Sequence, residues 1–305
     1  MPPSKTSTTK AELAPQQTGG DEQLALWAQR LAERMRCMGN VAIAFSGGVD
    51  SSVVSAAARR SCSGRVIAVT ADSPSLARSQ LEIAARVAKE IGIEHRIIAT
   101  GEGQVPGYRQ NAGQRCYFCK ATLYQAIGEM IKQFPQMEIV SGTNADDLGD
   151  YRPGLTAGRQ AGVHTPLADL QLAKPDVRRL AQWYGLSNQD LPAAPCLASR
   201  IAYGTEVTAP RLAAIEQAET WLRERGFREL RVRLHAGELA RIEVPRPQIA
   251  ELIQLDAEGS MTRAFQSFGF QFVTVDTEGF RSGNLNQLLV TIDVPDNMTQ
   301  KNSTR

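Results

Sequence analysis

The chain has 305 residues, of which 42% are hydrophobic and 22% charged, and its net charge is +2. This composition excludes a disordered chain, and no apolar run approaches the ~18–20 residues that a membrane helix needs. The small net charge argues against a nucleic-acid partner, because dedicated binders usually carry a stronger basic bias. We expect polar disordered tails at 1–22 and 296–305 and, since the N-terminus lacks the apolar stretch of a secretory signal, a cytoplasmic location.

Residues 23–190 predict one α/β domain, in which short apolar strands alternate with amphipathic or Ala-rich helices. Strands are expected at residues 40–45, 65–70, 95–99 and 138–141. Helices are expected at residues 21–38, 51–60, 79–91 and 117–134. This alternation predicts a parallel sheet whose ligands bind at the carboxyl ends of its strands.

In residues 191–295 strands and helices no longer alternate regularly, which predicts a smaller α+β domain. A helix is expected at 211–225 and another beginning at 247. Strands are expected at 229–234, 240–244 and 271–275. No internal repeat is present, so the second domain is not a copy of the first.

The segment Ala-Phe-Ser-Gly-Gly-Val-Asp-Ser-Ser joins the first predicted strand to a Ser-rich helix. Backbone N–H groups at a helix N-terminus bind anions, and paired glycines let a ligand approach the backbone closely. Because the Walker pattern G-x-x-x-x-G-K-[ST] is absent, transfer of a lysine-clamped γ-phosphate is disfavoured. We predict that ATP phosphates bind here, with contacts from Ala44, Phe45, Ser46, Gly47, Gly48, Asp50, Ser51 and Ser52. Asp50 is expected to contact Mg²⁺ or to cap the helix.

Two further segments follow predicted strands and are expected at the same pocket. Asp72 follows the second strand, where a fold of this kind usually holds the nucleoside. Gly142, Thr143 and Asp147 follow a later strand, where acidic side chains can hold Mg²⁺ or position ATP. Asp146 fits a helix cap equally well, and Asp147 is expected to face the ligand.

The five cysteines differ in their surroundings. Cys37 and Cys62 stand alone and are read as structural, whereas Cys116 and Cys119 form a C-x-x-C that opens a helix. Neighbouring cations and the helix dipole are expected to favour thiolates there, which leaves a zinc half-site, a redox pair and a cluster half-site open. Cys196 is the natural third ligand, and three thiolates suffice for a [4Fe–4S] cluster with one open iron.

The phosphate loop resembles the Ser-Gly-Gly-x-Asp-Ser signature of PP-loop ATP pyrophosphatases, which split ATP between its α and β phosphates. Together with Arg-Cys-Tyr-Phe-Cys-Lys at 115–120 and Pro-Cys-Leu-Ala-Ser-Arg at 195–200, it resembles the LarE family of ATP-dependent sulfur transferases of nickel-pincer nucleotide biosynthesis. The likeness spans roughly residues 21–295. It implies that ATP adenylylates a carboxylate of pyridinium-3,5-biscarboxylic acid mononucleotide, that pyrophosphate leaves, and that sulfur then gives a thiocarboxylate.

The resemblance also implies cofactors and roles. In one branch of the family a single cysteine is consumed as the sulfur source, and its members lack the C-x-x-C. Because this chain has that pair, it resembles the branch in which Cys116, Cys119 and Cys196 hold a [4Fe–4S] cluster. ATP and Mg²⁺ are the other expected cofactors, and a homo-oligomer and further proteins of pincer-cofactor synthesis are the expected partners.

Basic residues near these strings are candidates for substrate contacts. Cys196 is the expected catalytic cysteine, and Arg200 is expected to lower its pKa or to hold a substrate carboxylate. Arg231 and Arg233 share one face of a predicted strand and suit a phosphate or carboxylate. Weaker candidates are Lys120 for phosphate, and Glu216 and Glu219 for metal, although acids on a helix are by default solvated.

Three rival functions are weaker. Thiolation of tRNA shares the loop and the cysteines, yet it calls for a broad basic surface. Amidation needs ammonia delivery, for which the sequence offers no glutaminase half, and it leaves the cysteines unused. A non-catalytic ATP sensor has no need for the intact catalytic strings.

Overall fold

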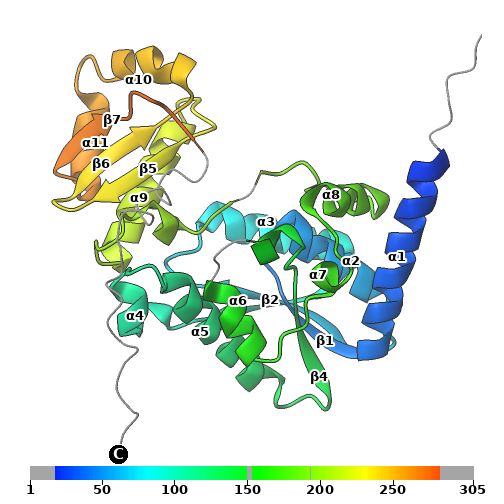
Figure 1. Ribbon diagram of the computed structural model, residues 1–305. Helices are drawn as coiled ribbons and strands as arrows, with labels where there is room; N and C mark the ends of the chain where they lie inside the picture. Colours follow the sequence, from blue (N-terminus) through cyan, green and yellow to red (C-terminus); the bar gives the residue numbers. More distant parts are fainter. Residues whose placement is uncertain (1–17, 150–152, 193, 282–305) are drawn as a thin grey trace, which may run out of the picture.

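The computed structural model describes residues 18–149, 153–192 and 194–281. Its larger sheet has the strand order β3-β2-β1-β4 (Figure 1). The strands are β1 (Asn40–Ala44), β2 (Val66–Asp72), β3 (Glu94–Ala99) and β4 (Met137–Ser141). Every pairing among them is parallel, which confirms the predicted fold class.

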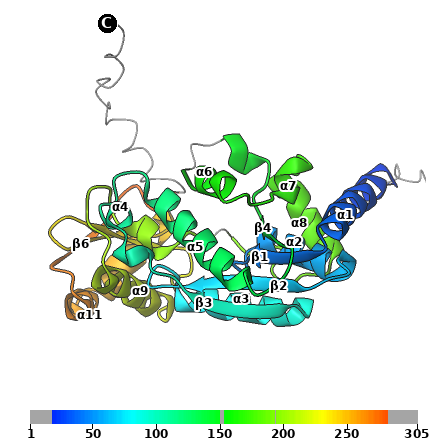
Figure 2. The ribbon, with the colours of Figure 1, turned by 90° about the horizontal axis from the view of Figure 1, so that it is seen from below.

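Helices cover both faces of this sheet (Figure 2). Val41 and Ile43 of β1 face one core, shared with α1 (Thr18–Met38), α2 (Val49–Ser61), α3 (Arg78–Ile91) and α8 (Lys174–Trp183). Ala42, between them, faces the other core, where α5 (Arg115–Ile131) contributes Tyr124 and Ile127. Successive residues of a strand point to opposite faces. A strand that is covered by helices on both faces is therefore apolar at every position of its sequence.

The strand order reverses its direction at β1 and β4. The chain winds from β1 outward to β3 and then returns to the far side of β1 as β4. Such a reversal is the topological switch point at which open parallel sheets bind ligands. The loop after β1 and the segment after β4 both begin here, as the sequence predicted.

A second sheet is formed by β5 (Arg231–His235), β6 (Leu239–Glu243) and β7 (Phe272–Val275). The β5–β6 pair is antiparallel and the β6–β7 pair is parallel. The helices α9 (Ala209–Arg223), α10 (Ile249–Leu255) and α11 (Ser260–Phe268) share its apolar core. Tyr108 of α4 (Pro106–Arg109) belongs to the same core, and Phe118 of α5 packs against it. This core is therefore assembled from distant parts of the chain.

The structure corrects the limit of the first tail. Helix α1 begins at Thr18, so residues 18–22 are helical rather than disordered, and Asp21 in the first turn suits the positive end of the helix dipole. Residues 1–17 and the expected tail at 296–305 lie outside the described residues. The domain limit near 190 stays a prediction. Within the described ranges, no helix combines the length and the apolar character that crossing a bilayer requires.

Several short helices were not predicted. They are α4, α6 (Pro153–Gln160), α7 (Pro166–Asp169), α8 and α11, with the 3-10 turns η1 (Glu102–Gln104), η2 (Asp146–Gly149) and η3 (Leu197–Arg200). The helix expected from 247 is present as the turn η4 (Arg246–Gln248) followed by α10. Proline occupies the first turn of α6, α7 and α8, which is a recognised signal for a helix start. These starts are therefore visible in the sequence itself.

Candidate functional site

The loop between β1 and α2 is shaped for an anion. Gly47 adopts φ +70°, and a Cβ there would lie 2.6 Å from the Ala84 backbone, so only glycine fits against α3. Gly48 is the N-cap residue of α2, and its carbonyl accepts hydrogen bonds from the hydroxyls of Ser51 (3.1 Å) and Ser52 (2.9 Å). The first turn of α2 thus presents its backbone N–H groups at the switch point.

The residues before the glycines fix where the loop leaves the sheet. The Phe45 N–H donates to the Val69 carbonyl (2.8 Å), which extends the pairing beyond Ala44, the last residue of β1. The Ser46 hydroxyl is exposed and accepts a hydrogen bond from the Gly48 N–H (3.2 Å). It is therefore both part of the turn and open to a ligand.

The segment after β4 comes into close contact with this loop. A Cβ at Gly142 would lie 2.6 Å from the Ser51 nitrogen, so the backbone passes directly over the start of α2. The next residue, Thr143, shares a hydrogen bond with the hydroxyl of Ser141 (3.0 Å). Both predicted residues thus lie at the phosphate loop.

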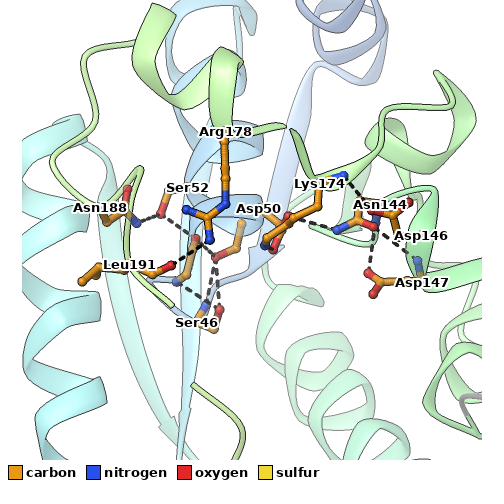
Figure 3. A network of polar contacts seen from close by, with 12 residues as sticks. Ser46, Asp50, Ser52, Asn144, Asp146, Asp147, Lys174, Arg178, Asn188 and Leu191 are labelled. Atoms are coloured by element: carbon orange, nitrogen blue, oxygen red, sulfur yellow. Dashed lines mark hydrogen bonds and ion pairs between the residues drawn. The ribbon is translucent and has the colours of Figure 1, made fainter. Parts of the chain in front are cut away.

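Asp50 is the centre of a polar network beside the phosphate loop (Figure 3). Its carboxylate forms an ion pair with Lys174 and accepts a hydrogen bond from the Asn144 side chain (3.1 Å). Asp146 accepts from the Lys174 backbone N–H (2.8 Å), and Asp147 accepts from that of Asn144 (3.1 Å). Asp146 thus binds the first backbone N–H of α8, and the carboxylate of Asp147 is turned to its own loop.

Lys174 and Asn188 are functional candidates that sequence reasoning missed. Lys174 is the first residue of α8, and its ammonium group joins the Asp50 carboxylate beside the phosphate loop. Asn188 is fully buried and donates to the Gly47 carbonyl and to the Ser52 hydroxyl, both at 2.8 Å. Both residues lie far from the phosphate loop in the sequence. The only local signal is the Lys-Pro start of α8, which points to Lys174.

Asp72 ends β2 and is paired rather than open. It forms an ion pair with Arg78 (2.7 Å), and the hydrogen bond that the Arg78 guanidinium donates to Asp72 raises the pKa of Arg78. The Arg78 backbone N–H also donates to Glu216 on α9 (2.5 Å). Glu216, a weak candidate for a metal ligand, therefore ties α9 to the start of α3.

The three predicted cluster cysteines come together from two segments. Cys116 and Cys119 lie in the first two turns of α5, and Cys196 is the N-cap residue of η3. The N–H of Leu197 donates to the Ser75 carbonyl (2.8 Å), which anchors the Cys196 loop beside the end of β2. Cys116 and Cys196 are exposed, and Cys119 is partly buried.

The environment of Cys119 corrects one expectation. Burial, together with the nearby Cys196, Glu102 and Cys116, raises the pKa of its thiol to about 12, while Lys120 acts in the opposite direction. The expected helix-dipole and cation effects are thus outweighed, and Cys119 is a neutral thiol at pH 7. The same effects place Cys116 and Cys196 each within electrostatic range of Cys119. Across the described stretches, no three Cys, His, Asp or Glu side chains are grouped tightly enough to hold a single metal ion.

Arg200 is a buried positioning residue behind Cys196. Its guanidinium pairs with Glu219 (3.0 Å) and donates to the carbonyls of Cys196 (2.9 Å) and Pro195 (2.5 Å). Burial alone would raise the pKa of Glu219, but Arg200 and Arg223 lower it below its ordinary value. Glu219 is therefore an ionised partner for these arginines rather than a solvated acid, and Arg200 shapes the loop that carries the thiol.

The two arginines of β5 differ. Arg233 is buried, pairs with Glu243 (3.0 Å) and donates to the Ser199 carbonyl (3.2 Å). Arg231 forms no ion pair with any described residue; burial lowers its pKa, and the charge of Arg200 lowers it further. Arg231 is thus the better placed of the two for an anionic ligand.

Lys120 follows Cys119 on α5. Its ammonium group lies 5.7 Å from the centre of the Tyr124 ring, and its side chain is exposed. The structure therefore leaves it near the cysteines and away from the phosphate loop network.

Comparison with known proteins agrees with this geometry. Residues 24–112 match the asparagine synthase family. An uncharacterized protein of Synechocystis sp. is 43% identical over 247 residues, which cover 81% of this chain and 92% of that protein. The pyridinium-3,5-bisthiocarboxylic acid mononucleotide synthase of Lactiplantibacillus plantarum is 34% identical over 274 residues, 87% of this chain and 96% of that one. An uncharacterized protein of Methanocaldococcus jannaschii is 27% identical over 242 residues, 79% and 91%.

The parallel sheet and the glycine-serine loop at its switch point define an ATP-using enzyme of the PP-loop class. The asparagine synthase match contains this loop and ends at Ala112, before the first of the three cysteines. The three cysteines therefore lie outside the asparagine synthase match. The similarity to the Lactiplantibacillus plantarum synthase extends over 274 residues and so continues beyond that match. The chain belongs to the family of that synthase, LarE.

Proposed function

We propose that this protein adenylylates a carboxylate of pyridinium-3,5-biscarboxylic acid mononucleotide with ATP, releases pyrophosphate and converts the carboxylate to a thiocarboxylate. The name of the Lactiplantibacillus plantarum relative supports this product class. Sulfur is carried, in this proposal, on a [4Fe–4S] cluster held by Cys116, Cys119 and Cys196.

The chemistry needs activation because a carboxylate is a poor electrophile. A carboxylate oxygen attacks the α-phosphorus of ATP, the bond to the β-phosphate breaks, and pyrophosphate leaves with the electron pair. Sulfide then attacks the acyl carbon, and AMP leaves, so no atom changes its oxidation state. The N–H groups of α2 and the Lys174 ammonium are placed to stabilise the charge that develops on the phosphates. Asp50 is the acid beside them that would hold Mg²⁺.

The observation that carries the proposal is the gathering of the three thiols beside the end of β2. All three are free, and two of them are exposed. Cys116 and Cys196 both interact electrostatically with Cys119, and three thiolates are a donor set suited to a [4Fe–4S] cluster with one open iron. When bound, the cluster would supply an open iron at which sulfide can be held for transfer.

Purification without oxygen, followed by supply of iron and sulfide, tests the sulfur source. We expect about four irons per chain and a broad visible band, both lost in Cys116→Ala. Cys37→Ala is the matched control, because Cys37 is exposed on α1 and should leave the iron content unchanged. A colourless protein that loses one sulfur atom from Cys196 after one turnover would replace the cluster with a consumed cysteine.

The activation step is tested separately by measuring pyrophosphate release with and without the dicarboxylic nucleotide. Release that depends on this nucleotide supports the proposal. Release that depends instead on tRNA, together with salt-sensitive tRNA binding, would favour the thiolation of tRNA.

A further inference from the structure

Three arginines are buried in the described part of the chain, and one of them has no acidic partner. Arg200 pairs with Glu219, and Arg233 pairs with Glu243. Arg115, the first residue of α5, is 6% exposed and forms no ion pair with any described residue. Taking a cation out of water is costly unless an opposite charge compensates it. A buried arginine without a carboxylate therefore points to an anion that binds there.

The guanidinium of Arg115 is held on one side and open on the other. Its Nη1 donates to the side-chain oxygen of Asn111, which is fully buried. Its Nε and Nη2 form another edge of the guanidinium; they donate to no described atom and are not fully buried. Such an edge, with two parallel N–H groups, matches the two oxygens of a carboxylate. A bidentate donor is thus available to a ligand.

Asn111 ties this arginine to a distant loop of the chain. Its amide nitrogen donates to the carbonyls of Ala202 (2.9 Å) and Thr205 (3.2 Å), in the loop that follows η3. The Gly204 N–H donates in return to the Asn111 carbonyl (3.2 Å). Asn111 adopts φ +54°, a left-handed conformation that asparagine accepts more readily than most residues. One asparagine therefore fixes both the loop and the Arg115 side chain.

The two segments joined in this way carry two of the three cysteines. Cys116 follows Arg115 directly in the first turn of α5. Cys196 is the N-cap residue of η3, and the contacts of Asn111 begin at Ile201, the residue after this turn (3.3 Å). Arg115 thus lies at the junction of the segments that supply these thiols. An anion bound to its open edge is held beside the start of the C-x-x-C helix.

We propose that Arg115 binds the carboxylate of the dicarboxylic nucleotide that is not being activated. The inference rests on the proposed function and deepens it, because it names a residue that selects the substrate. The two carboxylates stand on one rigid ring, so holding one of them fixes the place of the other for the attack by sulfur. A ring with a single carboxylate leaves the buried charge of Arg115 unpaired and is bound more weakly.

Two nucleotides that differ by one carboxylate test the assignment. The probes are pyridinium-3,5-biscarboxylic acid mononucleotide and the matching nucleotide with a carboxylate at position 3 alone. Their dissociation constants are measured by equilibrium dialysis without ATP, on protein reconstituted without oxygen, so that no turnover is needed. We expect the wild-type protein to prefer the dicarboxylic nucleotide by about 10–100-fold, the factor for charge-assisted hydrogen bonds. Arg115→Met should abolish this preference.

Two further variants separate recognition from charge and from folding. Arg115→Lys keeps the positive charge but loses the bidentate edge, so it should recover only part of the preference. Arg109→Met is the matched control, because Arg109 on the neighbouring α4 is exposed and pairs with Glu206. It should keep the wild-type preference. A folding defect weakens the binding of both nucleotides by the same factor, so the ratio of the two dissociation constants decides.

Each outcome decides the question. An unchanged preference in Arg115→Met would overturn the proposal and leave the proposed function standing. An equal loss for both nucleotides would overturn it as well, since Arg115 would then bind the shared phosphate or only support the fold. A wild-type protein that binds both nucleotides equally, or neither, also contradicts it. If the preference depends on Arg115 but ATP yields no pyrophosphate, the carboxylate site stands and the proposed function fails.

Discussion

The phosphate loop and the cysteine region lie at the same edge of the larger sheet, but they are built differently. The phosphate loop is held by backbone and hydroxyl groups within a few residues of one another, from Ser46 to Ser52. The cysteine region depends on buried ion pairs, in which Arg200 meets Glu219 and Arg233 meets Glu243. The turn of the first site is a local property of a strand–turn–helix unit, which Asn188 and Lys174 join from distant parts of the chain, whereas the second site exists only when distant segments have come together.

This contrast explains how the two sites should respond to change. Neutral, local hydrogen bonds contribute little each, and their loss is felt mainly by the ligand that they bind. A buried charge that loses its partner destabilises the whole fold. Four predictions follow this distinction from the largest expected effect to the smallest.

Replacing Cys196 should abolish sulfur transfer without affecting the reaction with ATP. Cys196→Ala is expected to lower thiocarboxylate formation by at least about 1,000-fold, as losses of a central catalytic group do. Pyrophosphate release should remain near the wild-type rate, because the phosphate loop does not depend on Cys196. The measurement is the two products assayed in parallel, and an equal loss of both would show that the sites are one unit.

Breaking a buried ion pair should cost stability rather than chemistry alone. Glu219→Gln leaves Arg200 without its charged partner and is expected to lower the free energy of unfolding by about 3–5 kcal/mol, measured with urea. Because the folded state lowers the pKa of Glu219, this stabilisation is present above the unfolded value of about 4.3 and is lost as the pH falls through the folded value.

The exposed Glu224→Gln on the same helix end is the control for that experiment. It should change the free energy of unfolding by less than about 0.5 kcal/mol, as surface substitutions usually do. A Glu219 variant as stable as this control would contradict the distinction between the two regions.

Replacing Lys174, the cation beside the phosphate loop, should weaken ATP binding and leave the stability of the fold nearly unchanged. Lys174→Met is expected to raise the KM for ATP by about 10–100-fold, the range for a lost charge-assisted hydrogen bond. The urea midpoint should move little, since Lys174 is partly exposed. Lys132→Met, at an exposed position of the chain, is the control, and an ATP response equal to it would exclude Lys174 from the phosphate site.

A single methyl group tests the close contact over α2. Gly142→Ala places a Cβ 2.6 Å from the Ser51 nitrogen and is expected to destabilise the fold by about 1–3 kcal/mol, with weaker ATP binding. In Gly128→Ala the new Cβ meets no described atom within 4 Å, so that variant of α5 should gain about 0.4–1 kcal/mol. Urea unfolding of both variants is the measurement, and similar values would contradict the packing described here.

The same contrast explains which parts could be predicted from the sequence. The strands of the larger sheet and the phosphate loop follow from apolar runs and a contiguous motif, and these needed no tertiary information. The three cysteines were grouped by family resemblance rather than by geometry, since Cys119 and Cys196 are far apart in the chain. The folded chain raises the pKa of Cys119 because burial outweighs the local helix effects that the sequence suggests.

Long-range partners account for most of what was missed. Lys174 reaches Asp50 across 124 positions, and Asn188 reaches Gly47 across 141. Glu219 looked like a solvated acid or a metal ligand because nothing in the local pattern shows that Arg200 and Arg223 surround it. Glu102 lies in a glycine-rich turn without a motif, and only the folded chain shows that it is buried.

The shared apolar core also has a consequence for synthesis of the chain. Tyr108 and Phe118 precede β4, yet they pack in the core of the sheet that contains β5, β6 and β7. When the first part of the chain leaves the ribosome, these rings and the Cys119 thiol have no cover until residues beyond 200 have followed. Nascent chains of this length therefore expose an apolar surface and a free thiol together, which makes this interval the one in which chaperones and oxidants can reach the future sulfur site.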